Sequence, residues 1–460
     1  MSHMHKRSRV GFGQTCHVDV TLLSEVVGSS YVRSATDEYL VDPLGRRGGG
    51  AKWVVVQPAD TAEVAEVLTR SAEVPVVVQA GNTGLVSGQI PPPTGPVGIV
   101  LSLRRLQQVE DVDTQCGTLG CGVTLATVQQ LARAQGAYYG VDLASRDSAT
   151  IGGTFATNAG GIRVCAYGST RKQVVGFEAV KADGSVISDL RGLAKDNTGY
   201  DLTSLLCGSE GTLAVVTRLR VAWQPAPRRA TLIALATPTL AEAYNIARDA
   251  VEPGFPLLAA EVVDTASWAD AAKEFGLPNP LGPAATTAYI LLLEVGDDTG
   301  GAGFRSTVQQ RNPVVALEPG QRRALWQLRE SQSQLWGRRP NVTKFDVCFP
   351  PESLDSAVAT IRTQFDGSAR LGIFGHIHEA NLHLQIVDAD VAQVLGIVAE
   401  SGGSISAEHG IGRDKAALLE LRRSQVEIDT MWSVKRAFDP HGRLNPGVLL
   451  PEQASEDHGR

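Results

Sequence analysis

Cysteine is scarce in this 460-residue sequence, and no two cysteines have the spacing of a C-x-x-C motif. The six residues are scattered, at Cys16, Cys116, Cys121, Cys165, Cys207 and Cys348. This scatter argues against a zinc ribbon and against a disulfide framework. We therefore expect reduced thiols in a cytoplasmic protein.

Long apolar runs and an excess of positive charge are also missing. No stretch of 18 apolar residues occurs, so the sequence predicts no membrane-spanning helix. The basic N-terminus MSHMHKRSRVGFGQ lacks the apolar core of a secretory signal. A net charge of −7 argues against nucleic acid as the main partner, because phosphate binding needs a basic surface.

The chain is longer than one hydrophobic core supports, so we expect two or three lobes. Short apolar runs alternate with amphipathic segments, which predicts an α+β fold. Strands are expected in WVVVQP, VPVVVQAG, VGIVLSL, LAVVTRLRV, ATLIALAT, TAYILLLEVG and VTKFDVCFP. Helices are expected over residues 61–73, 124–136, 240–252, 321–337, 351–365 and 414–438.

These patterns divide the chain into five parts. They are an N-terminal segment 1–49, a first lobe 50–225, a second lobe 226–413, a C-terminal helix and turn 414–450, and a tail 451–460. The boundary between the lobes falls in QPAPRRA (224–230), whose two prolines indicate a linker. The tail is polar, and we expect it to be disordered.

Glycine is concentrated in two stretches of the first lobe, QAGNTGLVSGQ (79–89) and DLASRDSATIGGTFATNAGG (142–161). Glycine lets a backbone approach a ligand closely, and successive free N–H groups bind anions such as a diphosphate. Neither stretch has the G-x-G-x-x-G of a Rossmann NAD site or the G-K-[ST] of a P-loop. Glycine-rich turns without a ligand are the alternative, but two such stretches in one lobe favour a large phosphate-bearing cofactor.

Several motifs in the same order give this chain a family resemblance. AGNTGLVSG, GCGVTL, DLASRDSATIGGTFATNAGG, KDNTGYDLTSLLCGSEGTL and FDPHGRLNPG resemble the FAD-binding lobe of the p-cresol methylhydroxylase/vanillyl-alcohol oxidase flavoproteins. Within that superfamily the chain resembles the D-2-hydroxyacid dehydrogenases. The resemblance implies a two-subdomain FAD-binding domain, an α+β substrate (cap) domain, and a C-terminal segment that returns to the FAD domain.

The same resemblance implies which residues contact FAD. Around the diphosphate it places Gly81, Asn82, Thr83, Gly84 and Gly88. On the flavin side it places Asp142, Ser148, Gly152, Gly153, Thr157, Asn158, Gly160 and Gly161, with Asn445 over the isoalloxazine ring. No histidine lies in the first stretch, so we expect the FAD to be held non-covalently.

Three of the nine histidines lie within FGHIHEANLHLQI (374–386). The alternation of Leu382, Leu384 and Ile386 with polar residues predicts a strand with one polar face. His376 would stand at the end of a preceding strand and fold back towards His383. In SAEHGIGRDK (406–415), Glu408 and His409 can serve one site only if this segment is a loop, because neighbours on a strand point to opposite faces.

Two imidazoles and a carboxylate form a donor set that suits Zn²⁺, with Mn²⁺ as an alternative. Spacing alone leaves structural or surface histidines equally acceptable. By resemblance to the dehydrogenase motif G-H-x-G-D-x-N-L-H and a downstream E-H pair, His376, His383 and Glu408 are the metal ligands and His409 is the catalytic base. Asn381 is expected at the substrate, and His378 is an extra histidine without a family role.

A cationic group for a substrate carboxylate is expected on the helix 321–337 and the strand after it. Arg329 and Ser333 stand one turn apart, and Lys344 follows fifteen residues after the arginine. A solvated arginine on a helix face is the alternative. By resemblance to the hydroxyglutarate enzymes, Arg329 and Lys344 bind the far carboxylate of a dicarboxylate with help from Ser333.

These observations predict an FAD-dependent, metal-assisted oxidation of a D-2-hydroxyacid, best D-2-hydroxyglutarate, by hydride transfer to flavin N5. We expect electrons to pass to a carrier such as electron-transferring flavoprotein, and a homodimer is compatible with the sequence. The alternatives are a D-lactate or glycolate dehydrogenase, an inactive flavin-binding structural subunit, and an enzyme of the alkylglycerone-phosphate synthase type.

Overall fold

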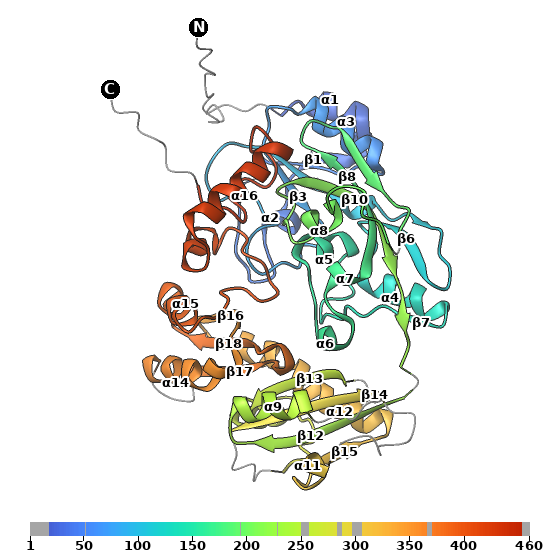
Figure 1. The fold of residues 1–460 in the computed structure, drawn as a ribbon. Coiled ribbons are helices and arrows are strands. Elements are labelled where there is room, and N and C mark those ends of the chain that lie inside the picture. The colour runs from blue at the N-terminus through green and yellow to red at the C-terminus, as the bar shows by residue number, and fades with distance from the viewer. Residues whose placement is uncertain are drawn as a thin grey trace.

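A computed structural model of the chain describes residues 18–50, 52–193, 195–227, 229–249, 257–282, 288–296, 306–365 and 370–452. Figure 1 shows two lobes, an N-terminal lobe in blue to green above and a cap lobe in yellow-green to orange below. The C-terminal helix α16 (Gln425–Phe438) lies beside the N-terminal lobe. Within the described residues no helix has both the length and the apolar character needed to cross a membrane.

The first half of the N-terminal lobe is a four-stranded sheet in the order β1-β2-β4-β3. Its strands are β1 (Val32–Ser34), β2 (Val54–Val56), β4 (Ile99–Ser102) and β3 (Val76–Gln79). The last three run parallel and are almost fully apolar and buried, as expected for strands covered on both faces. Helices α1 (Val20–Val27) and α3 (Thr61–Arg70) contribute Leu23, Val64 and Leu68 to the core beside this sheet.

The second half of this lobe is a five-stranded antiparallel sheet in the order β5-β6-β10-β8-β9. Its strands are β5 (Val109–Glu110), β6 (Cys116–Gly120), β10 (Ala214–Ala222), β8 (Val174–Lys181) and β9 (Val186–Asp189). Helices α4 (Leu125–Ala134) and α5 (Ile151–Thr157) pack their apolar residues into the same core. Helix α6 (Val164–Tyr167), which follows α5, lies at the edge of this lobe that faces the cap lobe (Figure 1).

The cap lobe contains a seven-stranded antiparallel sheet in the order β15-β12-β14-β13-β17-β18-β16. The strands are β15 (Val314–Ala316), β12 (Ala230–Thr237), β14 (Tyr289–Gly296), β13 (Leu257–Asp264), β17 (Leu371–His376), β18 (Asn381–Val387) and β16 (Val342–Cys348). Apolar residues of α9 (Leu240–Asp249), α14 (Leu354–Gln364) and α15 (Val391–Glu400) join one of its cores. Leu382, Leu384 and Ile386 point into that core, which leaves the other side chains of β18 on the opposite face.

The C-terminal segment is tied back to the N-terminal lobe. Leu444 forms an isolated parallel bridge with Val76. The buried ammonium of Lys435 on α16 donates to the carbonyls of Thr212 and Leu444, at 2.6 and 2.8 Å, and to Asp439 Oδ2 at 2.5 Å. The expected return of the chain to the first lobe is therefore present.

The α+β fold class is confirmed, and each predicted strand has a counterpart, but two helical expectations need correction and one helix was not expected. The segment 321–337 is two helices, α12 (Pro319–Glu330) and α13 (Gln332–Gly337), which meet at Ser331. The segment 414–438 begins with a 3-10 helix (Ala416–Leu421) before α16. The second glycine stretch contains α5, because Thr150 caps its N-terminus by accepting from Gly153 N.

The division into five parts stays a prediction. β11 (Gln224–Pro225) ends and β12 begins on either side of residues 226–229, within the expected linker. The expected disordered tail lies, from residue 453 on, outside the described residues, as does the N-terminal segment up to residue 17. The five cysteines among the described residues are free thiols, as expected.

Replacing Lys435 by Met should destabilise the protein by about 3–5 kcal/mol, because a buried charge pair loses one partner and two carbonyls lose a donor. The matched control is Arg423→Met, which removes an exposed ion pair with Glu427 and should cost less than about 1 kcal/mol. Thermal unfolding of the two variants beside the parent checks the difference. Equal melting temperatures for both variants would contradict the structural role of Lys435.

Candidate active site

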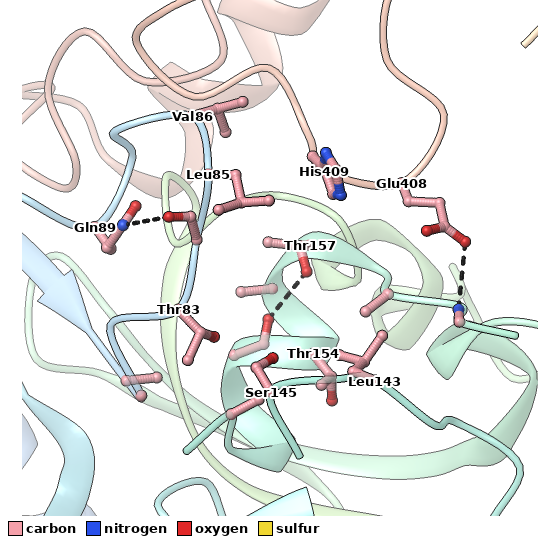
Figure 2. Close-up of a pocket in the computed structure, with 18 of the residues that line it drawn as sticks. Thr83, Leu85, Val86, Gln89, Leu143, Ser145, Thr154, Thr157, Glu408 and His409 are labelled. Atoms are coloured by element: carbon pink, nitrogen blue, oxygen red, sulfur yellow. Dashed lines mark hydrogen bonds between the residues drawn. The ribbon is translucent and has the colours of Figure 1, made fainter. Parts of the chain in front are cut away.

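A cavity of about 790 Å³ is lined by residues of both lobes. The N-terminal lobe contributes both glycine stretches, and the cap lobe contributes the polar face of its sheet and the loop that carries Glu408 and His409. Figure 2 shows this loop on one side of the cavity, with Thr83 and Leu85 of the first stretch and Thr154 and Thr157 of α5 around the rest. Two lobes therefore enclose one space, where a large ligand can meet groups from each.

The first glycine stretch fits a phosphate-bearing cofactor. No backbone N–H of residues 82–88, all of which are described, donates to another protein group. Asn82 and Ser87 have φ angles of 55° and 58°, so the backbone enters the left-handed region near both ends of the loop, a conformation that occurs in anion-binding nests. A Cβ at Gly81 would lie 2.1 Å from the carbonyl oxygen of Ser148, so only glycine lets the two stretches meet in one lining.

All but one of the predicted FAD-binding residues line the cavity. The exception is Asn158, which ends α5 in the left-handed conformation and accepts from Arg171 N at 3.0 Å through its side-chain oxygen. Its side chain is used to hold α5 against the following segment rather than to face the cavity. Asn445 lines the cavity, and its amide also joins two segments, accepting from Val78 N at 2.7 Å and donating to Glu210 O at 2.6 Å.

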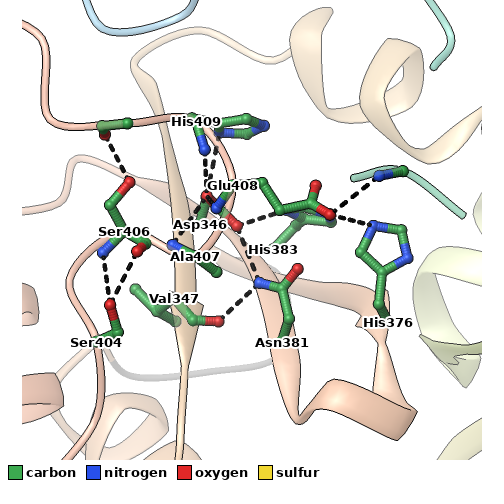
Figure 3. A network of polar contacts seen from close by, with 12 residues as sticks. Asp346, Val347, His376, Asn381, His383, Ser404, Ser406, Ala407, Glu408 and His409 are labelled. Atoms are coloured by element: carbon green, nitrogen blue, oxygen red, sulfur yellow. Dashed lines mark hydrogen bonds and ion pairs between the residues drawn. The ribbon is translucent and has the colours of Figure 1, made fainter. Parts of the chain in front are cut away.

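The three predicted metal ligands converge. One donor atom from each of His376, His383 and Glu408 lies within 4.8 Å of the other two. His376 ends β17, and a 3-10 turn (Ile377–Glu379) with Ala380 at a φ of 52° reverses the chain into β18, which carries His383. The AEHGIG segment is a loop, as predicted, and brings Glu408 Oε1 to 3.5 Å from His376 Nε2 (Figure 3).

Glu261 on β13 prepares His376 for a cation. Its Oε1 lies 2.5 Å from His376 Nδ1, so the proton on that nitrogen is fixed and Nε2 faces Glu408. Burial by itself lowers the pKa of His376, but the carboxylates of Glu261 and Glu408 raise it well above the ordinary value. A site that binds a proton this tightly, with a carboxylate orienting the imidazole, has the donors and the charge for a divalent metal.

Asp346 on β16 holds the loop that carries Glu408 and His409. Its carboxylate is almost fully buried and accepts from the backbone N–H groups of Ala407, Glu408 and His409 at 3.2, 2.6 and 2.9 Å (Figure 3). Burial opposes its charge, yet the imidazoles of His409 and His383 keep its pKa below the ordinary value. A carboxylate with three backbone donors sets both the position of the loop and the direction of its side chains.

His409 is the most accessible histidine of the cluster. Its imidazole stacks on that of His383 with ring centroids 5.7 Å apart, and its Nδ1 lies 3.7 Å from Asp346 Oδ2. Its side chain is 30% exposed and lines the cavity. Burial, by contrast, lowers the pKa of His383 to about 3, which keeps that ring neutral. His378 lies apart from the cavity lining and pairs with Glu379 at 2.9 Å.

The predicted carboxylate-binding residues have different surroundings. Arg329, Ser333 and Lys344 all line the cavity. Arg329 is already paired, with its Nε and Nη2 at 2.7 and 2.6 Å from Glu261 Oε2. Lys344 forms no ion pair with the described residues, and burial lowers its pKa. Asn381 does not line the cavity, because its amide donates to Asp346 Oδ1 and to the carbonyl of Val347, both at 2.9 Å.

Three buried carboxylates of the site were missed by the sequence analysis. They are Glu261, Asp346 and Glu210, which accepts from the backbone N–H groups of Ile411 and Gly412 at 2.8 Å. A signal exists for two of them, since Glu261 and Asp346 each interrupt an apolar run, in LLAAEVV and in FDV. Their partners lie far away in the sequence, so the sequence marks each acid as unusual but does not predict what it contacts.

Comparison with known proteins agrees with this geometry. Residues 226–449 match the family described as FAD linked oxidases, C-terminal domain, and residues 53–189 match the FAD binding domain. The chain is 32% identical to the probable mitochondrial D-2-hydroxyglutarate dehydrogenase of Oryza sativa subsp. indica, over 94% of this chain and 82% of the relative. It is 33% identical to the mitochondrial D-2-hydroxyglutarate dehydrogenase of Bos taurus, over 97% and 86%, and 31% identical to glycolate oxidase subunit GlcD of Bacillus subtilis, over 87% and 89%.

Two solved structures have the same fold at low identity. 4-Ethylphenol oxidase from Gulosibacter chungangensis superimposes with a TM-score of 0.68 at 18% identity, covering 94% of this chain and 97% of that one. p-Cresol methylhydroxylase with substrate bound gives the same TM-score at 14% identity, covering 94% and 96%. The expected superfamily fold is therefore confirmed.

Glu210 should make stability depend on pH between about 4.5 and 6. Burial raises its pKa from 4.5 to about 6 against the opposing effect of the two backbone donors. A carboxyl that binds its proton more tightly when folded stabilises the fold below the unfolded pKa and loses that contribution as pH rises through the folded one. The free energy of unfolding of the parent, relative to a Glu210→Gln variant that does not titrate, should fall by about 2 kcal/mol across this window.

Denaturant unfolding of both proteins at a series of pH values from 4 to 7 gives this difference directly. A difference that stays flat, or that grows with pH, would show that Glu210 is not a buried carboxyl of raised pKa.

Proposed function

The chain belongs to the family of FAD-linked oxidases that includes the D-2-hydroxyglutarate dehydrogenases and glycolate oxidase subunit GlcD, and we propose that it oxidises D-2-hydroxyglutarate to the 2-oxo acid. The observation that carries this proposal is the convergence of His376, His383, Glu408 and His409 at a cavity whose opposite wall has the features of an FAD site. His409, to which we assign proton removal, lies there beside the three residues to which we assign cation binding.

Each group of residues at the cavity has one role in the proposed reaction. His409 takes the proton of the substrate hydroxyl, because its imidazole is exposed to the cavity and its backbone is fixed by Asp346. His376, His383 and Glu408 would hold a divalent metal, with Zn²⁺ as the first candidate, and a bound cation would act as a Lewis acid on the substrate hydroxyl. The glycine stretches hold FAD non-covalently, and when bound it supplies the acceptor for the α-hydrogen.

Lys344 is the group we assign to the far carboxylate of the substrate, with Ser333 beside it. Asp346 pairs with His383 across β16 and β18, and Lys344 pairs with Gln385, two residues further along both strands. Two residues of a strand span roughly 6.6–6.8 Å. Lys344 therefore stands apart from the candidate metal ligand His383 along the two strands, where it can meet a second carboxylate, which lactate and glycolate lack.

Other substrates and partners remain open to direct test. D-lactate or glycolate is the nearest alternative, since a GlcD-type relative is among the similar proteins. We keep electron-transferring flavoprotein as the expected electron acceptor and a cytoplasmic location as the expectation from the sequence. The relatives from Oryza sativa and Bos taurus carry the word mitochondrial in their names.

The experiment that tests the function is anaerobic mixing of the FAD-loaded protein with a panel of D-2-hydroxyacids, followed by flavin absorbance. D-2-hydroxyglutarate should bleach the flavin fastest, and a metal chelator should abolish the bleaching until Zn²⁺ is restored. A preference for D-lactate or glycolate would replace the substrate. A flavin that stays oxidised with every acid would favour the inactive structural subunit.

His409→Ala should slow flavin reduction by about 10²- to 10⁴-fold, the usual contribution of a general base. FAD should remain bound, because the residues assigned to FAD lie in the other lobe. The matched control is His378→Ala, which removes the unassigned histidine and should leave the reduction rate unchanged. Stopped-flow absorbance measures both rates, and an unchanged rate in His409→Ala would remove this residue as the base.

A further inference from the structure

Two arginines from other parts of the chain hold the carbonyl groups of the first glycine stretch. Arg46 Nη2 donates to the carbonyl of Leu85 at 2.8 Å. Arg413 donates through its backbone N–H to the carbonyl of Val86 at 3.0 Å and through Nη1 to the carbonyl of Ser87 at 2.6 Å. Neither arginine lines the cavity, so three successive carbonyl groups are held from outside its lining.

These hydrogen bonds also fix the direction of the N–H groups that follow the three carbonyls. In a trans peptide group the C=O and the N–H of the next residue point in opposite directions, and the described chain has no cis peptide bond. The N–H groups of Val86, Ser87 and Gly88 therefore point away from the two arginines, and none of them donates to a backbone carbonyl of the described chain. Val86 and Gly88 line the cavity. The arginines thus hold the stretch with its free N–H groups available to an anion.

Arg413 belongs to the loop that carries His409, four residues further along the chain. The backbones of this loop and of the glycine stretch touch directly at Gly412. A Cβ at Gly412 would lie 1.9 Å from the carbonyl oxygen of Val86, and its φ angle is 56°, so only glycine allows this approach. The stretch assigned to the FAD diphosphate therefore lies against the loop assigned to proton removal.

Further contacts keep both arginines in place. Arg46 forms an ion pair with Asp414, the residue after Arg413, so it joins the same two segments from another side. Arg413 Nη1 also donates to the carbonyl of Ile90, and its Nε donates to the carbonyl of Pro446 at 3.2 Å. The connection between the two segments thus consists of side-chain donors as well as one backbone hydrogen bond.

We propose that Arg413 and Arg46 are positioning residues, which orient the first glycine stretch for the diphosphate of FAD and couple it to the loop that carries His409. FAD binding then stabilises that loop, and loosening the loop weakens FAD binding, because coupling between two sites is reciprocal. The inference rests on the FAD site of the proposed function and requires neither a metal nor a particular substrate.

FAD affinity of the cofactor-free chain is the first test, measured by the change in flavin fluorescence on titration. Arg413→Met should bind FAD about 10-fold more weakly than the parent, because two carbonyls of the stretch lose a charged donor. The matched control is Arg322→Met, since Arg322 Nη1 also donates to two carbonyls, those of Ala230 and Leu317, but does not line the cavity. This control should bind FAD as the parent does. Parental affinity in Arg413→Met, or an equal loss in Arg322→Met, would overturn the inference.

Hydrogen exchange followed by mass spectrometry separates the coupling from a general loss of stability. Saturating FAD should slow the exchange of residues 82–88 in both the parent and Arg413→Met. It should slow the exchange of residues 405–415 strongly in the parent and only weakly in Arg413→Met, because the variant lacks the side chain that joins the two segments. Equal protection of residues 405–415 in both proteins would contradict the coupling.

Arg46→Met is a second variant for the case that Arg413→Met does not fold. The side chain of Arg46 is 37% exposed, and Asp42, its other partner, still accepts from the backbone N–H groups of residues 44 and 46 when the guanidinium is lost. FAD binding in Arg46→Met should be about 3- to 10-fold weaker, and FAD should protect residues 405–415 less than in the parent. Parental values for both measurements would overturn the inference.

The two proposals fail in different ways. Parental FAD affinity and parental protection in the arginine variants would overturn the inference and leave the proposed oxidation untouched. A parent that binds FAD but whose flavin is bleached by no D-2-hydroxyacid would overturn the proposed function, while the affinities and the exchange rates would still decide the role of the arginines.

Discussion

The carboxylate of Asp346 is the contact on which the site depends. It is buried on β16, and three successive backbone N–H groups of the loop 407–409 converge on it. The loop has no regular secondary structure, so without this acceptor its backbone N–H groups would need other partners inside a cavity lined by both lobes. Because the same carboxylate lies between His383 and His409, one residue of β16 positions these two imidazoles and the loop relative to one another.

Two other buried carboxylates, Glu261 and Glu210, also hold groups of the site in position. Glu261 orients His376 from the cap sheet, and Glu210 of the N-terminal lobe binds the backbone of the same loop at Ile411 and Gly412. Each acid is buried at a cost that its donors offset. The loop is thus held by one carboxylate from each lobe, which keeps His409 opposite the glycine stretches. The wall of the cavity formed by the glycine stretches and the wall formed by the histidine cluster are connected through it.

Much of the fold and of the site could be predicted from the sequence where the pattern is local. The alternation of Leu382, Leu384 and Ile386 predicted a strand with a polar face, and the glycines after His409 predicted the loop. The predictions were wrong where tertiary contacts, and not the local sequence, set the conformation of a residue. The expected helix 321–337 is interrupted at Ser331. The side-chain amides of Asn158 and Asn381 form hydrogen bonds with backbone groups or with a carboxylate, so they do not line the cavity. The strand that carries Glu261 was not predicted, since its apolar run is equally compatible with a buried helix.

The amino-acid sequence alone defines the chemistry available to this protein: two glycine stretches, a cluster of imidazoles and carboxylates, and the family motifs that relate them to FAD and hydroxyacids. Residue types and short spacings carry that information because they set backbone freedom and donor atoms within a few positions. Which charged side chains contact one another depends on the tertiary packing. Arg329 and Glu261 are 68 positions apart and Glu408 and His376 are 32 apart, and no local pattern encodes a pairing across strands and loops that packing alone brings together.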